Sequence, residues 1–352
     1  MTKAEPTEPT ILFLEVEPWE QDYLMKHSPP LWRARFYPDE ADRIARDKIA
    51  DAEILSTFIY SDLDATLLGQ LQKLKMIATR STGYDHIDIP FCRQKGIAVC
   101  NVPTYGANTV AEHTFALILS LSRKIYQARA RTIQGNFSFR GLQGFDLMGK
   151  TLGVLGTGQI GRHVIRIASG FQMRVLAHDA RPDPSIAELL GFQYVDLSEL
   201  LSRADIITLH TPLTPATRHL IGKPQFQRMK RGVLLINTAR GGLVDTDALL
   251  WALEEGIVGG AGLDVLEEEE AIREERELLS SRFNEERLRS VVRNHILLRR
   301  EDVIITPHIA FNSREAVERI MATTLENISG FLEGISRNRV VRLPCDDRAA
   351  SD

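Results

Sequence analysis

The residues that could do chemistry in this chain follow short apolar runs. Arg240 comes shortly after GVLLI, His308 shortly after DVIIT, and Asp264 directly after GGAGL. Glu269 lies five positions beyond Asp264. In open α/β sheets, ligands bind outside the carboxyl ends of the strands. An imidazole that transfers a proton and a guanidinium that binds an anion suit hydride transfer to a charged carbonyl compound. Each residue alone also has a structural explanation, so their joint occurrence carries the hypothesis.

Three glycines predict a dinucleotide site. Residues 151–170, TLGVLGTGQIGRHVIRIASG, begin as an apolar strand, turn at Gly156, Gly158 and Gly161, and continue as a helix expected over 159–169. The first glycine permits a sharp turn, the second lets the backbone approach a pyrophosphate, and the third lets helix and strand pack closely. The helix N-terminus offers free N–H groups to the phosphates.

Asp179 favours NAD over NADP. It lies 18 positions after Gly161, close to the roughly 20 expected for a carboxylate that binds the ribose hydroxyls. Such a carboxylate would repel a 2′-phosphate, although the nearby Arg181 moderates the preference. The chain has no G-x-x-x-x-G-K-S/T motif, so nucleoside triphosphate hydrolysis is not supported.

Composition excludes several classes of protein. The 352 residues suit two domains, and 43 basic against 47 acidic residues give a net charge of −4. That balance argues against a nucleic-acid or anionic-membrane partner. No apolar run is long enough to span a membrane, and the polar N-terminus lacks a signal-peptide core. The three scattered cysteines have no metal-ligand spacing, so we expect no metal and a cytoplasmic protein.

Apolar runs alternate with helix-like stretches, which predicts βαβ units and two open parallel α/β sheets. One long helical pattern over 107–134 should connect them. The charged segment 266–300 is expected to be a solvated helical excursion, with a lid or partner surface as the alternative. The predicted strands are residues 11–16, 34–37, 52–57, 74–79, 97–100, 151–155, 173–177, 193–195, 205–209, 232–236, 259–263 and 302–306.

Seven motifs, in this order, resemble the NAD-dependent D-isomer-specific 2-hydroxyacid dehydrogenases over nearly the whole chain. The resemblance implies a flavodoxin-like substrate domain of residues 1–105 and 309–352, a Rossmann cofactor domain of residues 106–308, and a cleft between them. The motifs are STGYDHIDI (81–89), NVPTYGANTVAEHT (101–114), GTGQIG (156–161), HTPLTPATRHLI (210–221), NTARGGLVD (237–245), AGLDVLEEE (261–269) and TPHIAFNSREA (306–316).

The resemblance also implies roles for the catalytic residues. Arg240 matches the arginine that binds the substrate carboxylate and keto oxygen, and a guanidinium can donate two parallel hydrogen bonds. His308 matches the acid/base histidine, and an imidazole can transfer a proton near neutral pH. Glu269 matches the carboxylate that orients this histidine, and Asp264 matches an aspartate near the nicotinamide carboxamide.

The remaining site residues divide between substrate and cofactor. Tyr105 resembles the tyrosine of the D-lactate dehydrogenase branch. Phe58 and Phe311 could form a small apolar wall, although core packing is the more common reason for such residues. The predicted substrate-binding residues are Ser81, Thr82, Gly83, Tyr105, Phe58 and Phe311. The predicted cofactor-binding residues are Gly156, Gly158, Gln159, Ile160, Gly161, Asp179, His210, Thr211, Pro212, Thr238, Ala239 and Asp264.

These residues predict an NAD-dependent oxidoreductase that interconverts a small D-2-hydroxy acid and its 2-keto acid, with D-lactate and pyruvate as first choice. Glyoxylate, hydroxypyruvate and branched 2-keto acids remain alternatives, because one methylene changes selectivity by only ~1–3 kcal/mol. The rival from another class is an NADH-sensing, corepressor-like binding protein. A homodimer, with the helix at 107–134 as contact, is expected through the resemblance.

Overall fold

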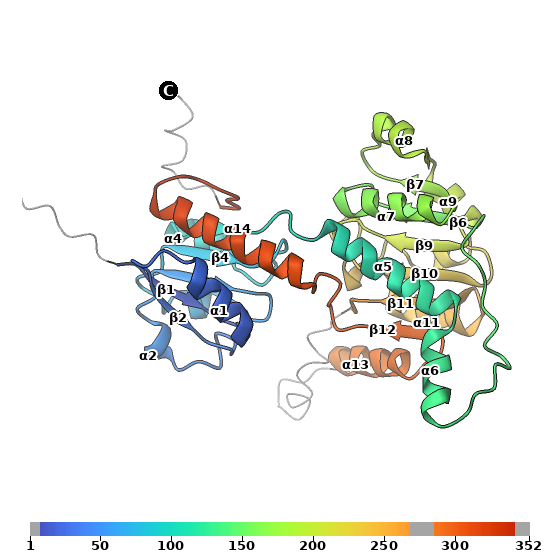
Figure 1. The fold of residues 1–352 in the computed structure, drawn as a ribbon, viewed down its shortest axis with the longest axis horizontal. Helices are drawn as coiled ribbons and strands as arrows, with labels where there is room; N and C mark the ends of the chain where they lie inside the picture. The colour runs from blue at the N-terminus through green and yellow to red at the C-terminus, as the bar shows by residue number, and fades with distance from the viewer. Residues whose placement is uncertain (1–7, 268–284, 342–352) are drawn as a thin grey trace, which may run out of the picture. The chain divides into compact units, whose positions relative to one another are not determined.

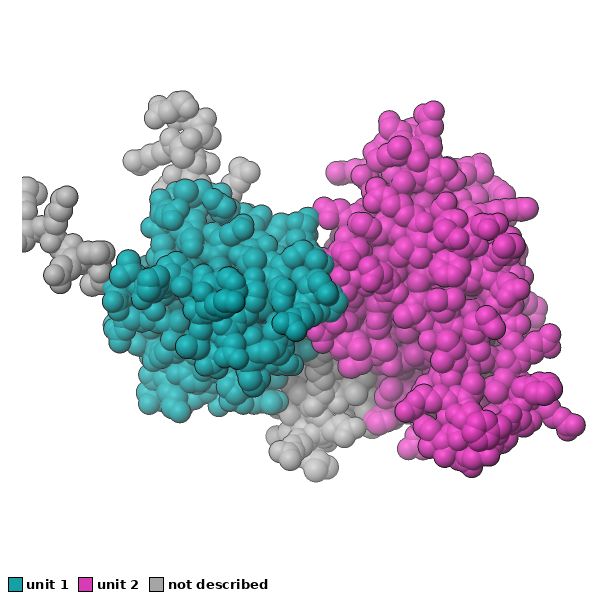
Figure 2. Space-filling view, viewed as in Figure 1, with its two compact units in different colours: residues 1–105, 313–352 teal, residues 106–312 magenta. Residues whose placement is uncertain are grey.

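The computed structural model describes residues 8–267 and 285–341, with the side chains of 285–291 left out. It divides into two compact units (Figure 2). Unit 1 consists of residues 1–105 and 313–352, and unit 2 consists of residues 106–312. The helices in the described part of the chain lack the length and apolarity needed to cross a bilayer.

Unit 1 is built on a five-stranded parallel sheet with the order β2-β1-β3-β4-β5, which is the flavodoxin-like order. Helices α1 and α14 pack against each other, and α14 also contacts β4 (Figure 1). The strands are β1 Thr10–Phe13, β2 Arg33–Phe36, β3 Ile54–Thr57, β4 Met76–Thr79 and β5 Ala98–Cys100. The helices are α1 Pro18–His27, α2 Arg46–Ile49, α3 Ala65–Leu68, α4 Ile89–Lys95 and α14 Arg314–Leu332.

Unit 2 is built on a seven-stranded parallel sheet with the order β12-β11-β10-β9-β6-β7-β8, the Rossmann order with one added edge strand. The strands are β6 Thr151–Leu155, β7 Arg174–His178, β8 Gln193–Tyr194, β9 Ile206–Leu209, β10 Val233–Asn237, β11 Val258–Leu263 and β12 Val303–Ile305. The helices are α5 Ala107–Ser122, α6 Ile125–Ile133, α7 Gln159–Gly170, α8 Pro184–Leu190, α9 Leu197–Arg203, α10 Lys223–Phe226, η1 Gly241–Leu243, α11 Thr246–Glu254 and α13 Glu285–Leu298.

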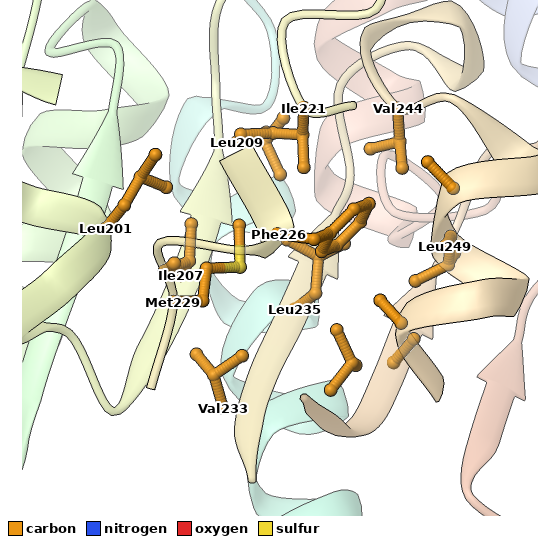
Figure 3. Close-up of a cluster of buried hydrophobic side chains, with 14 of the residues drawn as sticks. Leu201, Ile207, Leu209, Ile221, Phe226, Met229, Val233, Leu235, Val244 and Leu249 are labelled. Atoms are coloured by element: carbon orange, nitrogen blue, oxygen red, sulfur yellow. The ribbon is translucent and has the colours of Figure 1, made fainter. Parts of the chain in front are cut away.

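Helices cover both faces of this sheet. On one face, Leu235 belongs to a buried cluster with Phe226 of α10 and Leu249 of α11 (Figure 3). On the other face, Leu234 and Ile236 belong to a cluster with residues of α5 and α7. Successive residues of β10 therefore enter opposite clusters, as the alternation of side chains along a strand requires. A sheet buried on both faces explains why its strands are continuous apolar runs.

Local capping explains where several helices begin. Asp64, Asp88, Asp245 and Ser313 each accept a hydrogen bond from a backbone N–H in the first turn of α3, α4, α11 and α14, respectively. Such caps satisfy backbone donors that have no partner within the helix. Helix α4 ends at Gly96, whose φ of 70° is left-handed and favours glycine.

The α/β class with two parallel sheets is confirmed, and each predicted strand overlaps an observed one. The single helix expected over 107–134 is wrong. The structure has α5 and α6 instead, and Lys124 between them has a φ of 50° that no α-helix accommodates. The charged segment is also not wholly solvated where it is described, since Asn294 and Leu297 of α13 are each 1% exposed.

Candidate active site

The glycine turn after β6 has the geometry that a dinucleotide needs. Gly156 has a φ of 96°, and a Cβ there would lie 2.7 Å from the backbone oxygen of His210. A Cβ on Gly161 would collide with the backbone oxygen of Gly156, so the helix lies against the turn. A Cβ on Gly158 would meet nothing within 4 Å. The space beside Gly158, at the N-terminus of α7, therefore fits a pyrophosphate.

Asp179 follows β7 and is held beside this turn. One carboxylate oxygen accepts hydrogen bonds from the backbone N and Oγ1 of Thr157, at 2.6 and 2.9 Å, and the other accepts one from the N–H of Arg181 at 2.9 Å. Burial raises the pKa of Asp179, but these hydrogen bonds outweigh it and leave the pKa below its ordinary value. The carboxylate is therefore charged at neutral pH, as repulsion of a 2′-phosphate requires.

His210 and Thr211, at the end of β9, lie against the Gly156 turn. The Nε2 of His210 shares a hydrogen bond of 2.9 Å with Thr208, and burial lowers the pKa of His210 to about 3. The His210 Nδ1 and the Thr211 Oγ1 are buried and have no hydrogen-bond partner among the described residues. Buried polar atoms without partners are rare in proteins, so their position beside the turn fits a bound group that supplies one.

Arg240 follows β10 in a loop fixed by Asn237. The Asn237 side chain donates to the backbone oxygen of Arg240 at 2.9 Å and accepts from the N–H of Ala239 at 3.0 Å. The Arg240 guanidinium donates one hydrogen bond of 2.8 Å to the Ala239 carbonyl. A guanidinium has five N–H donors, so most of its capacity remains for an anion.

His308 follows β12 with a left-handed φ of 55°. Asp264, which is 1% exposed, supports this loop. Its carboxylate accepts hydrogen bonds from the N–H groups of Ile309 and Ala310, at 2.9 and 2.8 Å, and its backbone oxygen accepts one from the N–H of His308. Thr306 Oγ1 donates to the same carboxylate at 2.5 Å. Asp264 therefore acts on the histidine loop in addition to any contact with cofactor.

Glu267 is the last described residue before the predicted Glu269, and its carboxylate is held within unit 2. Glu269 lies outside the described residues, and its role stays a prediction. The Glu267 carboxylate is engaged by His219 at 2.6 Å and by Thr246 at 3.0 Å, and it lies 3.4 Å from Arg218. Glu267 is therefore engaged by side chains of its own unit.

In unit 1, the Ser81–Gly83 loop follows β4. Ser81 Oγ donates to the Gly83 carbonyl at 2.5 Å, and Thr82 Oγ1 donates to the Val102 carbonyl at 2.8 Å. The Tyr105 carbonyl accepts from Arg319 of α14 at 2.5 Å. These contacts tie the ends of β4 and β5 and the C-terminal helix into one unit.

The other predicted residues, apart from Phe58 of unit 1, lie at or near the ends of unit 2 strands. Gln159 and Ile160 open α7, and Pro212 follows β9. Thr238 is 7% exposed and shares a hydrogen bond of 3.0 Å with Thr114 of α5. Phe311 lies in the loop between β12 and α14, and Phe58 of unit 1 packs edge-on against Tyr60. Among the described residues, no group of His, Cys, Asp and Glu could hold a metal ion.

Three residues of the site region were missed by sequence reasoning. Thr157 holds Asp179, Arg80 lies buried beside the Ser81–Gly83 loop, and His113 of α5 shares a hydrogen bond of 3.0 Å with Thr306. Each acts on a residue distant in sequence. Thr157 and His113 carried a usable signal, because they lie within the motifs at 156–161 and 101–114, whereas Arg80 lies just before the motif at 81–89.

Replacing Gly161 with alanine tests the packing of the turn. Its Cβ would meet the fixed backbone of Gly156, so we expect the free energy of unfolding to fall by about 1–3 kcal/mol and NADH binding to weaken. Gly170→Ala, at the end of the same helix where a Cβ meets nothing, is the matched control and should cost nothing. Chemical denaturation of both variants measures the difference, and equal stabilities would contradict the close approach.

The Rossmann sheet, the glycine turn and the carboxylate beside it define a dinucleotide-binding protein. Arg240 after β10 and His308 after β12, with β11 between these strands, suit an oxidoreductase. The profile described as "D-isomer specific 2-hydroxyacid dehydrogenase, NAD binding domain" matches residues 115–310. The chain belongs to this family and is one of its NAD-dependent oxidoreductases.

Individual relatives agree with this assignment. The D-lactate dehydrogenase of Escherichia coli K12 is 40% identical over 288 residues, which cover 80% of this chain and 84% of that protein. A glyoxylate reductase of Korarchaeum cryptofilum is 34% identical over 308 residues, which cover 86% of each chain. The crystal structure of an Aquifex aeolicus D-lactate dehydrogenase, complexed with NAD and lactic acid, has a TM-score of 0.78 at 37% identity and covers 92% of this chain and 96% of that one.

Proposed function

We propose that this protein reduces small 2-keto acids to D-2-hydroxy acids with NADH, and that pyruvate and D-lactate are its preferred pair. One observation carries the chemistry. Arg240, Asp264 and His308 follow β10, β11 and β12, which are neighbouring strands of one parallel sheet. An anion-binding guanidinium and a proton donor therefore stand at the same edge of unit 2, where such sheets bind ligands.

The residues divide the reaction among them. NADH, when bound, supplies the hydride. The Arg240 guanidinium binds the substrate carboxylate and the keto oxygen through parallel hydrogen bonds. Protonated His308 gives its proton to that oxygen as negative charge develops there. Asp264 holds the His308 loop, and Glu269 would orient the imidazole. Ser81, Thr82 and Gly83 of unit 1 would contribute backbone N–H groups to the carboxylate.

The predicted apolar residues and the known relatives both favour a small substrate. Tyr105, Phe58 and Phe311 would form a small wall that suits a methyl group. A D-lactate dehydrogenase and a glyoxylate reductase occur among the relatives, at 40% and 34% identity, respectively. Glyoxylate, hydroxypyruvate and branched 2-keto acids are therefore the alternatives. The cytoplasmic location stays a prediction from composition.

The test is a substrate panel. Purified protein is mixed with NADH and with pyruvate, glyoxylate, hydroxypyruvate or a branched 2-keto acid, and loss of the reduced-cofactor absorbance is followed. We expect the highest kcat/KM with pyruvate. A higher value with another member would transfer the assignment to that acid, and no oxidation of NADH with any member would favour the corepressor-like alternative.

We also propose a homodimer built on α6 and the loop after it. No residue of α6 is buried. Exposed apolar side chains cluster along this stretch, and such clusters mark interaction surfaces. They are Ile125, Tyr126, Ile133, Phe137, Phe139 and Met148, which are between 52% and 85% exposed.

Light scattering coupled to gel filtration tests the dimer. We expect wild type to have about twice the 39.6 kDa mass of one chain, and Phe137→Ser with Phe139→Ser to give the monomer mass, because these rings are 82% and 85% exposed in the single chain. Leu31→Ser, at a 66% exposed site of unit 1, should leave the mass unchanged. A monomeric wild type, or a double variant that stays dimeric, would overturn the proposal.

A further inference from the structure

Arg80 is an unusual residue at the carboxyl edge of the unit 1 sheet, because its charged side chain is only 3% exposed. It follows β4, and its guanidinium reaches past β3 to the end of β1. There it donates to the backbone oxygens of Leu14 and Glu15, at 2.6 and 2.8 Å, and on the way it donates to Ser56 Oγ at 3.2 Å. The sheet order β1-β3-β4 makes this a link across three neighbouring strands.

Glu15 continues this link to the loop after β3. Its side chain accepts hydrogen bonds from Thr57 Oγ1 at 2.7 Å and from the N–H groups of Ser61 and Tyr60, at 2.9 and 3.1 Å. Ser61 Oγ also donates to it, and accepts from the N–H of Ala41 at 3.0 Å. One carboxylate therefore fixes both ends of the 57–61 loop.

The backbone of Glu15 supports a functional interpretation. Its φ is 55°, which is left-handed and uncommon for a residue with a side chain. Such a conformation is strained and persists only where surrounding contacts fix it. Here the Arg80 guanidinium holds the Glu15 carbonyl, and the β3 loop holds its carboxylate.

The charges of this network compensate one another. Burial lowers the pKa of Arg80, and the negative charges of Glu20 and Glu15 oppose that effect. Burial raises the pKa of Glu20, and the Arg80 charge offsets only part of it. Removing one member would leave the others buried and uncompensated, which costs more than the loss of a single hydrogen bond.

Two loops with predicted substrate residues depend on this network. The 57–61 loop carries Phe58, whose ring packs edge-on against Tyr60 at a centroid distance of 5.5 Å. Arg80 itself precedes Ser81, and its backbone N–H donates to the Thr57 carbonyl at 2.7 Å. A change at either Arg80 or Glu15 therefore reaches both the apolar wall and the carboxylate loop.

We propose that Arg80 and Glu15 are positioning residues that hold the Phe58 loop against the Ser81–Gly83 loop and thereby set which 2-keto acid side chains are accepted. This inference rests on the proposed function and adds two specificity determinants to it. Neither residue touches the substrate in this scheme. They act by fixing the spacing of two loops, and shifts of about 1 Å in such supports are enough to change rates and selectivity.

Glu15→Gln is the informative variant, because glutamine keeps the shape and loses the charge. We expect the KM for pyruvate to rise about tenfold, since a hydrogen bond to a charged group is weakened. The preference for pyruvate over a branched 2-keto acid should fall by a similar factor, because the wall is no longer held. The dissociation constant of NADH should stay unchanged, since the glycine turn belongs to unit 2. Amide hydrogen exchange at Tyr60 and Ser61 should become faster.

Glu53→Gln is the matched control. Glu53 is also a carboxylate engaged by a hydrogen bond on this sheet, here with Lys75 at 2.6 Å, but it lies before β3 at the amino edge. It should leave the pyruvate KM and the selectivity unchanged. Arg80→Lys keeps the positive charge but loses the planar guanidinium with its several N–H donors. The folded Arg80→Lys protein should show the same rise in pyruvate KM and the same loss of selectivity as Glu15→Gln.

The outcomes separate the two claims. Wild-type protein that reduces no 2-keto acid would refute the proposed function. An active wild type together with a Glu15→Gln variant of normal pyruvate KM and normal selectivity would refute the positioning role alone. A variant that loses NADH affinity in the same proportion would likewise show a general loss of structure and overturn the inference.

Discussion

Protein with asparagine in place of His308 is expected to reduce 2-keto acids at least about 100-fold more slowly than wild type, with NADH affinity unchanged. General acid catalysis contributes about 10²–10⁴-fold to a rate. The amide side chain can donate a hydrogen bond to the keto oxygen but cannot supply a proton to it. The loss should therefore appear in kcat, measured by absorbance at saturating substrate, while NADH binding is measured separately by fluorescence.

Asparagine is the suitable replacement because residue 308 has a left-handed backbone conformation. His308 has a φ of 55°, and asparagine tolerates the left-handed region better than most residues. The N–H of residue 308 can still donate to the Asp264 carbonyl at 2.9 Å. His219→Asn is the control, since His219 has a φ of 51° and lies in the same unit. The control should keep kcat near wild type, and an active His308→Asn variant would remove the histidine from its role.

Arg240→Lys is expected to raise the KM for 2-keto acids by about 10- to 100-fold. The lysine keeps the positive charge but loses the planar fork that binds a carboxylate through two parallel hydrogen bonds. Asn237 holds the backbone at Ala239 and Arg240, so the loop should keep its position in the variant. Steady-state kinetics over a range of pyruvate concentrations gives the KM, with NADH held at saturation.

Arg231→Lys provides the comparison for this variant. Arg231 lies just before β10 at its amino end, and its guanidinium donates to the Glu255 carbonyl. It is exposed and far along the strand from Arg240. Its replacement should leave the KM unchanged. An Arg240→Lys enzyme with unaltered affinity for pyruvate would show that bidentate binding is not used.

The parts of the fold that could be predicted are those encoded by neighbouring residues. The strands of both sheets are short apolar runs, because parallel strands are buried on both faces. The glycine turn was predictable because its three glycines lie within six residues, directly between a strand and a helix. The contact that excludes a Cβ at Gly161 is with Gly156, in the same turn. Helix α7 accordingly begins where it was expected, at Gln159.

The helix break at Lys124 was not predictable in this way. Residues 107–134 contain no glycine or proline, so the local pattern indicates one continuous helix. The break follows from packing instead. Gly144 lies so close to the Ser122 carbonyl that a Cβ there would collide with it, and Lys124 donates to the Gly141 carbonyl at 2.9 Å. The returning loop thus competes with continuation of the helix.

The support of the candidate site was also beyond sequence reasoning. Arg80 contacts Leu14 and Glu15 from 66 and 65 positions away, and Asp264 reaches Ala310 over 46 positions. No local sequence pattern indicates hydrogen bonds between residues so far apart in the chain. The motifs indicated which residues could do the chemistry, but only the sheet order shows which side chains hold them.

Transfer of a labelled hydride tests the central claim most directly. NADH carrying deuterium at the transferred C4 position is incubated with pyruvate and stoichiometric protein, and the product is examined by NMR and by its stereochemistry. The account predicts one deuterium at C2 of D-lactate. Unconsumed NADH, or lactate without the label, would contradict it.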